Sequence, residues 1–460
     1  MMTKANTTNY SDKRVQNQYE ALPYPPRDPQ DENQRLQITG TDFLDLLNFY
    51  GFEGKQDFQD IRILVAGGGT GDSSIFLAEQ LRNTDSTIIH LDMSAASIAI
   101  AKERAAIRGL TNITFIQDSL LNLPQMNLEP FDYINCIGVL HHLPNPQTGL
   151  DALAEVLKDD GAMAIMVYGL YGRTGVYQMQ ELMRLVNSTT SSIADEVENC
   201  KYILQSLPDS NWFCRGEDLH NDHQKMGDAG IYDLLLHKQD RAYTIPQFYD
   251  LLSNSSLTVR SLYALFGQAR YIYNPASWCR NPSLLETFHN LPPQKQQAIA
   301  ELMCGTMKTH TAFVSKRSHP AKLPNLADET LIPFFSAQVL IQIPGLNTEI
   351  NSNIRSIADG STFTLRTPQC SMKLEKTSLL PEILDNLDGQ RSIGEIADAV
   401  VAIKANKAPI ERRDAIKQIY DFYNKLNYAD WMLLRQPNSW VQPSIQSLQQ
   451  AMLAHKTTAA

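Results

Sequence analysis

The chain has 460 residues, of which 43% are hydrophobic, and it carries a formal net charge of −10 at pH 7. This length is enough for two or three domains with ordinary buried cores. The acidic balance argues against a protein whose main role is to coat nucleic acid, so we expect no nucleic-acid partner.

Cysteine usage and the lack of long apolar runs indicate the compartment. The six cysteines are scattered without a C-x-x-C pair, which fits neither a zinc site nor a disulfide framework and favours reduced thiols. Residues 1–20 lack the apolar core of a secretory signal, and no apolar run approaches the ~20 residues that span a bilayer. We therefore expect a cytoplasmic protein with no membrane partner.

Residues 1–40 are interpreted as an N-terminal arm. Residues 1 to about 15 are polar and expected to be mobile, whereas residues 19–29 (YEALPYPPRDP) hold four prolines in seven positions. Proline fixes its own backbone angle, so this stretch predicts an extended, polyproline-like path. Two interpretations stay open: an arm laid across a ligand site with Tyr19 or Tyr24 facing the reacting group, or a rigid leader packed on the domain surface.

The most informative stretch is residues 62–74 (RILVAGGGTGDSS). An apolar run typical of a strand buried on both faces breaks into glycines, and a helical pattern starts at Asp72. Glycine lets the backbone adopt positive φ or approach a ligand closely, and the first turn of the helix offers free N–H groups. A second apolar strand, residues 87–91, ends in Asp92 about 20 residues after the glycines, where an acidic group can accept from both hydroxyls of a ribose.

Strands and helices alternate through the rest of this region. Such alternation predicts a parallel sheet covered by helices on both faces, with ligands at the carboxyl ends of the strands. An amphipathic helix over residues 41–52 is expected to precede the first strand. The further predicted strands cover residues 113–117, 131–137 and 162–168, and the predicted helices cover residues 72–82, 95–108 and 147–157.

The pattern changes after the fifth strand. Residues 175–250 are interpreted as a helical insertion, in which a helix over residues 176–186 is followed by a polar segment over residues 187–199. The core is predicted to return and to complete a seven-stranded sheet near residue 317. Its returning elements are a helix over residues 246–253 and strands over residues 257–265 and 309–316.

A second unit is predicted beyond the sheet. Residues 318–330 are a polar linker, residues 331–445 form an appendage, and residues 446–460 are a tail expected to be disordered at its end. Ser392 and Glu395 precede an apolar helix in a capping-box pattern. The succession of helix, turn, helix and helix resembles a small winged-helix-like α+β module.

Five sequence blocks, in chain order, carry a family resemblance: VAGGGTG, HLDMS, FIQDSL, FDYINCIGVLHHLPNP and LKDDGAMAIMVYG. Together they resemble the class I S-adenosylmethionine-dependent methyltransferases, over roughly residues 60–170. The resemblance implies an α/β fold with a seven-stranded, mainly parallel, doubly wound sheet within residues 41–317, and S-adenosylmethionine as cofactor. One position departs from the family: Val65 lies where an acid usually helps to organise the methionine end of the cofactor.

The resemblance also implies a set of cofactor-binding residues. Asp92 would bind the ribose hydroxyls, Asp118 would face the adenine amine, and the backbone around Gly138 would meet the sulfonium end. Without the resemblance, Asp92 could be a helix cap and Asp118 a plain turn residue. The full set is Gly67, Gly68, Gly69, Gly71, Asp92, Met93, Asp118, Ser119 and Gly138.

His142, Tyr24 and Tyr168 are the candidate catalytic residues. An imidazole at the substrate edge could deprotonate a hydroxyl or ammonium nucleophile. The alternative is that His141 and His142 only pack the loop. Two adjacent histidines on a strand-to-helix loop do not face the same way, and no third ligand is near in sequence, so no metal is expected.

The substrate is expected beside the predicted insertion. Five residues there are candidates for binding it: Tyr171, Arg173, His237, Arg241 and Tyr243. The two arginines could hold a carboxylate or a phosphate in bidentate geometry. Alternatively, they form ion pairs with neighbouring acids such as Asp233 and Asp240.

These inferences favour a methyltransferase that moves a methyl group by in-line displacement from S-adenosylmethionine to a protein side chain or a small molecule. The protein mainly supplies alignment, because the leaving group is already cationic. The leader and the appendage resemble those of multi-domain bacterial methyltransferases. The alternative is a catalytically silent cofactor-binding or scaffold module, which the loss of the acid at Val65 would allow. Nucleic-acid methylation ranks third, since no N/D-P-P-Y motif follows the fourth strand.

Overall fold

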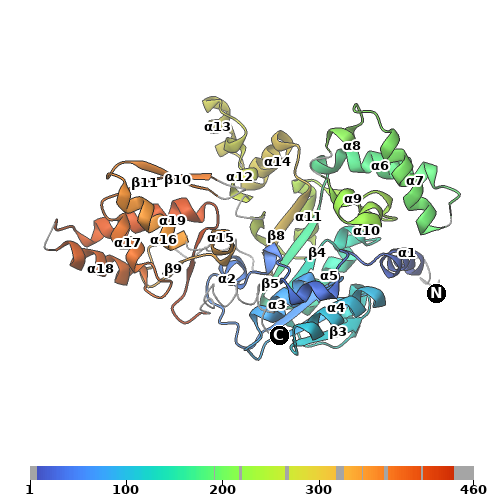
Figure 1. Cartoon of the computed structure of the whole chain (residues 1–460), viewed down its shortest axis with the longest axis horizontal. Helices are drawn as coiled ribbons and strands as arrows, with labels where there is room; N and C mark the ends of the chain where they lie inside the picture. Colours follow the sequence, from blue (N-terminus) through green and yellow to red (C-terminus); the bar gives the residue numbers. More distant parts are fainter. Residues whose placement is uncertain are drawn as a thin grey trace.

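The computed structural model describes residues 8–190, 192–216, 220–264, 269–316, 326–343, 346–366, 371–405 and 408–439. Its centre is a sheet with the strand order β3-β2-β1-β4-β5-β8-β7, seen near the middle of Figure 1. Only β8 runs antiparallel to its neighbours on this path. The predicted seven-stranded, mainly parallel sheet is therefore confirmed, and a short eighth strand, β6, pairs in parallel with β5. The strands are β1 (Arg62–Ala66), β2 (Thr87–Asp92), β3 (Ile113–Gln117), β4 (Phe131–Ile137), β5 (Leu157–Gly169), β6 (Ala242–Tyr243), β7 (Thr258–Tyr263) and β8 (Thr309–Ser315).

Successive residues of each strand face opposite sides of the sheet. Ile63 and Val65 belong to a core shared with α2 and α3, whereas Leu64 and Ala66 belong to a core shared with α5 and α11. Both faces are therefore covered, as the apolar strands predict. The helices of this domain are α2 (Leu44–Phe52), α3 (Asp72–Gln80), α4 (Ala95–Ile107), α5 (Pro146–Val156), α11 (Ile245–Asn254), α12 (Ala269–Ile272), α13 (Pro282–His289) and α14 (Pro293–Cys304).

A helix is found within residues 41–52 as predicted, but the prediction that one of its faces is polar and exposed is wrong. A short 3-10 turn, Gly40–Asp42, precedes α2, and every residue of α2 is buried. The physical reason is that α2 lies between the sheet and the C-terminal unit. Its apolar side chains share one core with Phe313 of β8 and with Leu434 of the C-terminal unit, and Tyr50 donates a hydrogen bond to Asp430.

The arm is more ordered than its polarity predicts. Residues 1–7 lie outside the described residues, but α1 covers Thr8–Ala21, so the expected mobility of residues 1–15 is wrong from Thr8 onward. The side chain of Glu20 accepts from the N–H groups of Ala95 and Ala96 at the start of α4, which holds the arm there. Residues 22–28 form neither helix nor strand, as their prolines predict.

The insertion is a helical unit with its own small core. It contains α6 (Thr174–Val186), α7 (Ile193–Ser206), α8 (Trp212–Arg215), α9 (Asp222–Lys225), α10 (Gly227–Ile231) and a π-helical turn, Tyr232–Leu236. The second half of the polar segment over residues 187–199 is helical. There α7 begins after Ser192, whose hydroxyl accepts from the N–H of Asp195, and its apolar side faces the insertion core.

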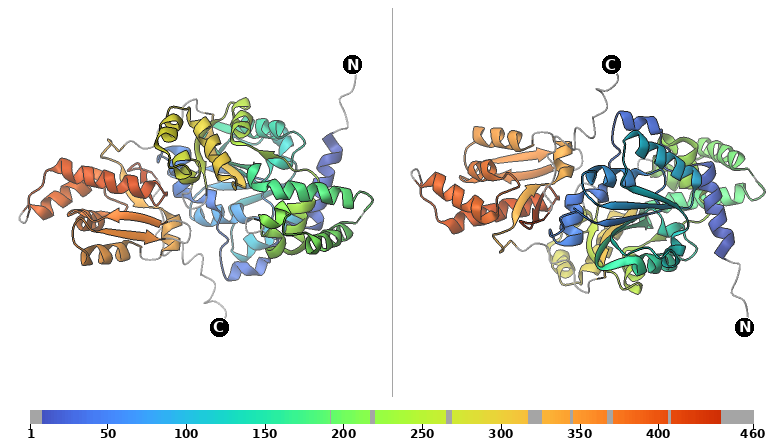
Figure 2. Two further views of the ribbon diagram at one scale, coloured as in Figure 1. Left: turned by 90° about the horizontal axis from the view of Figure 1, so that it is seen from above. Right: turned by 90° about the horizontal axis from the view of Figure 1, so that it is seen from below.

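The C-terminal unit lies at the opposite end of the long axis from the insertion (Figures 1 and 2). A β10–β11 hairpin comes before the three helices α17–α19, and β12 pairs with β9. Ser392 and Glu395 form both bonds of the predicted capping box. Residues 318–325 and 440–460, which include most of the predicted linker and the whole tail, lie outside the described residues. The elements are β9 (Ile332–Phe335), α15 (Ala337–Gln342), α16 (Leu346–Ser356), β10 (Thr362–Arg366), β11 (Ser371–Glu375), α17 (Leu380–Asn386), α18 (Ile393–Lys404), α19 (Arg412–Asn427) and β12 (Met432–Arg435).

The winged-helix comparison for this unit stays a prediction. Within the described parts of the chain, none of the helices combines the length and the apolar character that a membrane crossing requires.

Candidate active site

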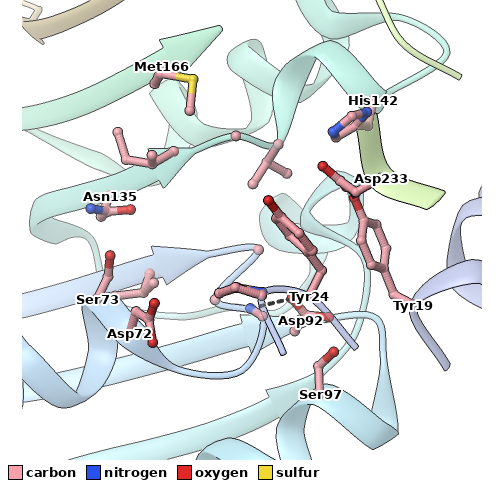
Figure 3. A pocket seen from close by; sticks show the side chains of 18 of the residues that line it. Tyr19, Tyr24, Asp72, Ser73, Asp92, Ser97, Asn135, His142, Met166 and Asp233 are labelled. Carbon is pink, nitrogen blue, oxygen red and sulfur yellow. Dashed lines mark hydrogen bonds between the residues drawn. The ribbon is translucent and has the colours of Figure 1, made fainter. Parts of the chain in front are cut away.

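A cavity of about 460 Å³ opens at the carboxyl ends of β1, β2, β4 and β5 (Figure 3). This volume lies within the roughly 300–1,000 Å³ that is usual for small-molecule sites. The sequence candidates that line it are Gly67, Gly68, Gly69, Asp92, Met93, Asp118, Ser119, Gly138, Tyr24, His142, Tyr168 and Arg173. Gly71 is not among the described lining residues. It is the N-cap of α3 with φ of 101°, and Ala101 packs where its side chain would be.

The glycine turn and Asp92 form one end of the cavity. Gly67 and Gly69 have φ of 71° and 53°, which favours glycine. One carboxylate oxygen of Asp92 accepts from the N–H of Gly69 at 2.7 Å, and the other accepts from the N–H of Ser94 at 2.8 Å. Burial raises the pKa of Asp92, while these two N–H groups act to lower it. The N-cap of α4 is Ser94 and not Asp92, so the carboxylate of Asp92 orders the two turns and still keeps lone pairs for a ligand.

These residues fit an adenosyl group. Asp92 offers two acceptor oxygens beside a backbone that carries no side chains, which suits vicinal hydroxyls. Asp118 accepts from Ser119 N–H and from Asn122 Nδ2 at 2.7 Å, both on Oδ1, so Oδ2 keeps its acceptor capacity. Its role as a turn residue and a role toward adenine are therefore compatible.

The main chain of Gln239 fixes which ring nitrogen carries the proton in two histidines, His142 and His237. Its carbonyl oxygen lies 3.0 Å from Nδ1 of His142 and can only accept, so that nitrogen carries the proton. Its N–H donates to Nδ1 of His237 at 3.1 Å, so that ring carries its proton on Nε2. Nε2 of His142 is buried and has no hydrogen-bond partner among the described residues. His142 lines the cavity and therefore has the tautomer that a general base needs.

A buried acid, Asp233, lies beside these histidines. Tyr19 of the arm donates to one of its oxygens at 3.0 Å, and Tyr168 of β5 donates to the other at 3.5 Å. Burial raises the pKa of Asp233, and the neighbouring His142 acts to lower it. Figure 3 shows His142, Asp233 and Tyr19 gathered on the side of the cavity away from Asn135 and Ser73. This side, which we call the acceptor chamber, is bounded by the arm, the insertion and β5.

Two groups of side chains in this region could in principle hold a metal ion. They are His142, Asp233 and His237, and His141, His142 and Asp240. In the first group, His237 has its proton on Nε2 and its Nδ1 lone pair engaged by Gln239. In the second, Asp240 already pairs with Arg173 at 3.3 Å. A metal is therefore still not expected.

The candidate substrate residues are divided by the structure. Arg173 lines the cavity, stacks 3.6 Å from the ring centroid of Tyr168 and pairs with Asp240, as its alternative interpretation has it. His237 stacks behind His142 at 3.8 Å between ring centroids. The other three candidates, Tyr171, Arg241 and Tyr243, are not among the described lining residues.

The structure shows why Tyr171, Arg241 and Tyr243 do not line the cavity. Tyr243 pairs with β5 through β6 and packs into the core below the chamber. Tyr171 and Arg241 are exposed to solvent. Of the five candidates, Arg173 thus lines the cavity and His237 lies directly behind its lining, and a role of any of them toward a substrate stays a prediction.

Several polar residues of the site were not predicted. Asp233 and Gln239 lie in the insertion, where no periodic pattern marks them. Asp42 and Asn135 lie behind the glycine turn, joined by a 2.7 Å hydrogen bond from Asn135 Nδ2. Asn135 pairs in register with Val65 on the neighbouring strand. Its place beside the position where the family usually has an acid was the only sequence signal that could have indicated Asn135 as a site residue.

The strand order, the glycine turn and the cavity define a class I S-adenosylmethionine-dependent methyltransferase domain, with S-adenosylmethionine as its cofactor. Residues 57–237 match the model of a family described as a methyltransferase domain. The structure is similar to that of PKMT2 from Rickettsia typhi in complex with AdoHcy. That likeness has a TM-score of 0.62 at 14% identity and covers 86% of this chain and 76% of that one, which shows a shared fold.

Three sequence relatives are similar over parts of the chain. An uncharacterised protein of Synechococcus sp. is 37% identical over 43% of this chain and 47% of its own length. The ubiquinone biosynthesis O-methyltransferase of Haemophilus ducreyi is 26% identical over 32% of this chain and 54% of its own. The tRNA 5-carboxymethoxyuridine methyltransferase of Escherichia coli is 32% identical over 25% and 42%. The chain thus spans about half the length of these relatives. The expected absence of a nucleic-acid partner stays a prediction.

Proposed function

We propose that the whole protein is a methyltransferase that moves the methyl group of S-adenosylmethionine to an acceptor bound in the acceptor chamber. The observation that carries the proposal is that one cavity joins the glycine turn and Asp92 to His142, whose buried Nε2 has no hydrogen-bond partner in the described part of the chain. When bound, the cofactor supplies a methyl group on a cationic sulfur, which an acceptor lone pair can displace. The chain itself has to align that lone pair and remove a proton.

The residues of the chamber suit an acceptor that must lose a proton. His142 would take the proton of a hydroxyl or ammonium group on Nε2, while the Gln239 carbonyl stabilises the resulting imidazolium through Nδ1. Tyr19 and Tyr168 hold the carboxylate of Asp233 in place beside it. The arm and the insertion both line the cavity, through Tyr19 and Asp233 among others. A cavity of this size suits a small molecule or a single protruding side chain of a protein.

Transfer of labelled methyl groups in a cell lysate tests this proposal. The full-length protein should label one class of acceptor, and His142→Asn should label far less at equal S-adenosylhomocysteine affinity. Sizing the product after protease or ribonuclease treatment separates protein, RNA and metabolite acceptors. Binding of S-adenosylhomocysteine without any labelled product would instead support the silent cofactor-binding module.

A further inference from the structure

A buried carboxylate without a counter-ion lies behind the cavity, on the side away from the acceptor chamber. Asp42, in the turn before α2, has no exposed surface. Thr39 Oγ1 donates to it at 2.6 Å and Asn135 Nδ2 at 2.7 Å, and the hydroxyls of Ser73 and Tyr133 donate to it as well. Among the described residues no lysine, arginine or histidine forms an ion pair with it. A buried charge of this kind is costly unless something compensates it.

Three of the four donors also line the cavity: Thr39, Ser73 and Asn135. Thr39 and Ser73 each use their O–H on Asp42, whereas Asn135 uses one N–H on Asp42 and directs the other at Thr41 Oγ1, 3.5 Å away. All three therefore have oxygen lone pairs left to offer the cavity. In Figure 3 Asn135 and Ser73 lie together on one side of the cavity, and the oxygen of the Asn135 amide is turned toward it. The result is a group of three acceptor oxygens backed by one carboxylate. A primary ammonium, with three N–H donors and a positive charge, is the ligand group that matches it.

The position of this group explains the departure at Val65. Val65 also lines the cavity and pairs in register with Asn135 on the neighbouring strand. Its side chain faces the same side of the sheet as the core around α2, which is where Asp42 lies. The carboxylate missing from β1 is thus present on an adjacent segment, one hydrogen bond behind the cavity wall.

We propose that Asp42 is a positioning residue that takes over the role of the acid absent at Val65. Through Thr39, Ser73 and Asn135 it forms the subsite for the α-ammonium group of S-adenosylmethionine. The inference rests on the cofactor and deepens the proposed function. The alternative is a purely structural role, in which Asp42 only joins the turn before α2 to β4 through its hydrogen bonds with Tyr133 and Asn135.

Two ligands that differ in the ammonium group separate these roles. S-adenosylhomocysteine carries it, whereas methylthioadenosine keeps the adenosine and the thioether but lacks the amino-acid end. By calorimetry on the full chain, Asp42→Asn should lower the affinity for S-adenosylhomocysteine by about tenfold or more. The affinity for methylthioadenosine should change by less than about twofold. Asp92→Asn is the matched control and should lower the affinity for both ligands. Equal effects of Asp42→Asn on both ligands, or none on either, would overturn the proposal.

A rescue variant makes the test stricter. Val65→Asp in the Asp42→Asn background returns a carboxylate to the family position, and we expect it to restore most of the S-adenosylhomocysteine affinity. If Asp42→Asn does not fold, Ser73→Ala removes one acceptor from the half-buried start of α3 and should show the same ligand selectivity. No selectivity there would also overturn the proposal. Failure of methyl transfer with the selectivity intact would count against the proposed function alone.

Discussion

The hydroxyl of Tyr19 donates to the carboxylate of Asp233 at 3.0 Å. These residues are 214 positions apart in sequence, so one hydrogen bond joins the arm to the insertion beside the cavity. Asp233 is buried and Tyr19 is half-buried, and burial raises the pKa of each. The tyrosine therefore stays protonated and remains a donor at physiological pH.

Tyr19→Phe should loosen the arm. Loss of one hydrogen bond to a buried carboxylate costs about 1 kcal/mol or more, so the open arm should become roughly fivefold more populated. Trypsin cleavage at Arg27 should accelerate by about that factor. Tyr202→Phe on the exposed surface of α7 is the control. An unchanged cleavage rate in Tyr19→Phe would show that other contacts hold the arm.

His142→Asn should lower kcat by roughly 10²–10⁴-fold. The asparagine amide can still donate to the Gln239 carbonyl, but it has no counterpart to Nε2. S-adenosylhomocysteine affinity should change by less than about twofold, and exposed His289→Asn should behave as wild type. Steady-state rates and calorimetry check this. A wild-type kcat in His142→Asn would mean that no base is needed there.

Gly69→Ala should weaken cofactor binding more than its backbone strain explains. Gly69 and Gly109 both have positive φ, 53° and 64°, so alanine should destabilise either site by about 1 kcal/mol. A Cβ at Gly69 would also lie 2.8 Å from the carbonyl oxygen of Tyr24, whereas nothing lies within 4 Å at Gly109. Urea unfolding should give a larger loss of stability for Gly69→Ala, because the backbone of Tyr24 has to shift, and calorimetry should give a loss of S-adenosylhomocysteine affinity only for Gly69→Ala. Equal affinities would contradict the prediction.

Glu32→Gln should destabilise the protein by about 3 kcal/mol. Glu32 is a buried residue of the arm and pairs with Arg104 at 2.7 Å and with Arg108, so its neutralisation leaves two buried cations undercompensated. Glu181→Gln breaks an exposed pair with Arg184 and should cost no more than about 0.5 kcal/mol. Chemical denaturation measures both. Similar losses in the two variants would refute the distinction.

His90 should make stability depend on pH. Burial lowers its pKa to about 4 from the ordinary 6.5, so folding favours the neutral ring. Its stabilising contribution is complete above pH 6.5 and is lost as the pH falls toward 4, by up to roughly 3 kcal/mol. His90→Gln keeps a partner for Ser74 and removes this titration. The stability gap between wild type and the variant should therefore shrink from pH 7 to pH 4.5, and a constant gap would disprove the assignment.

The sheet and the cofactor end of the site could be predicted because their signals are local. In the first half of the sheet, short apolar runs in the sequence predict the strands, and Asp92 comes at the end of its predicted strand. In contrast, the tautomer of His142 depends on Gln239, 97 positions away. No periodicity encodes such a contact, so base and packing roles could not be separated from sequence.

The mispredicted helices share a different cause. Polar residues in α1 suggested mobility, yet Glu20 caps another helix and Gln16 donates to the carbonyl of Met93 at 2.9 Å. The amphipathic helix predicted over residues 41–52 implied a polar side, but Asp45 of α2 is buried and accepts the N–H of Ala337 from the C-terminal unit. Tertiary partners thus reversed what local composition indicated. The sequence shows that Val65 departs from the acid usual in the family. That the carboxylate of Asp42 lies close enough to replace this acid could be inferred only from the folded structure.

Because α2 shares one apolar core with the sheet and with the C-terminal unit, the appendage and the catalytic half should melt in a single cooperative transition. A truncation after residue 316 would leave α2 with a bare hydrophobic flank and invite aggregation. Anyone preparing a minimal catalytic fragment should therefore keep residues 326–439 or replace the apolar positions of α2 that they cover.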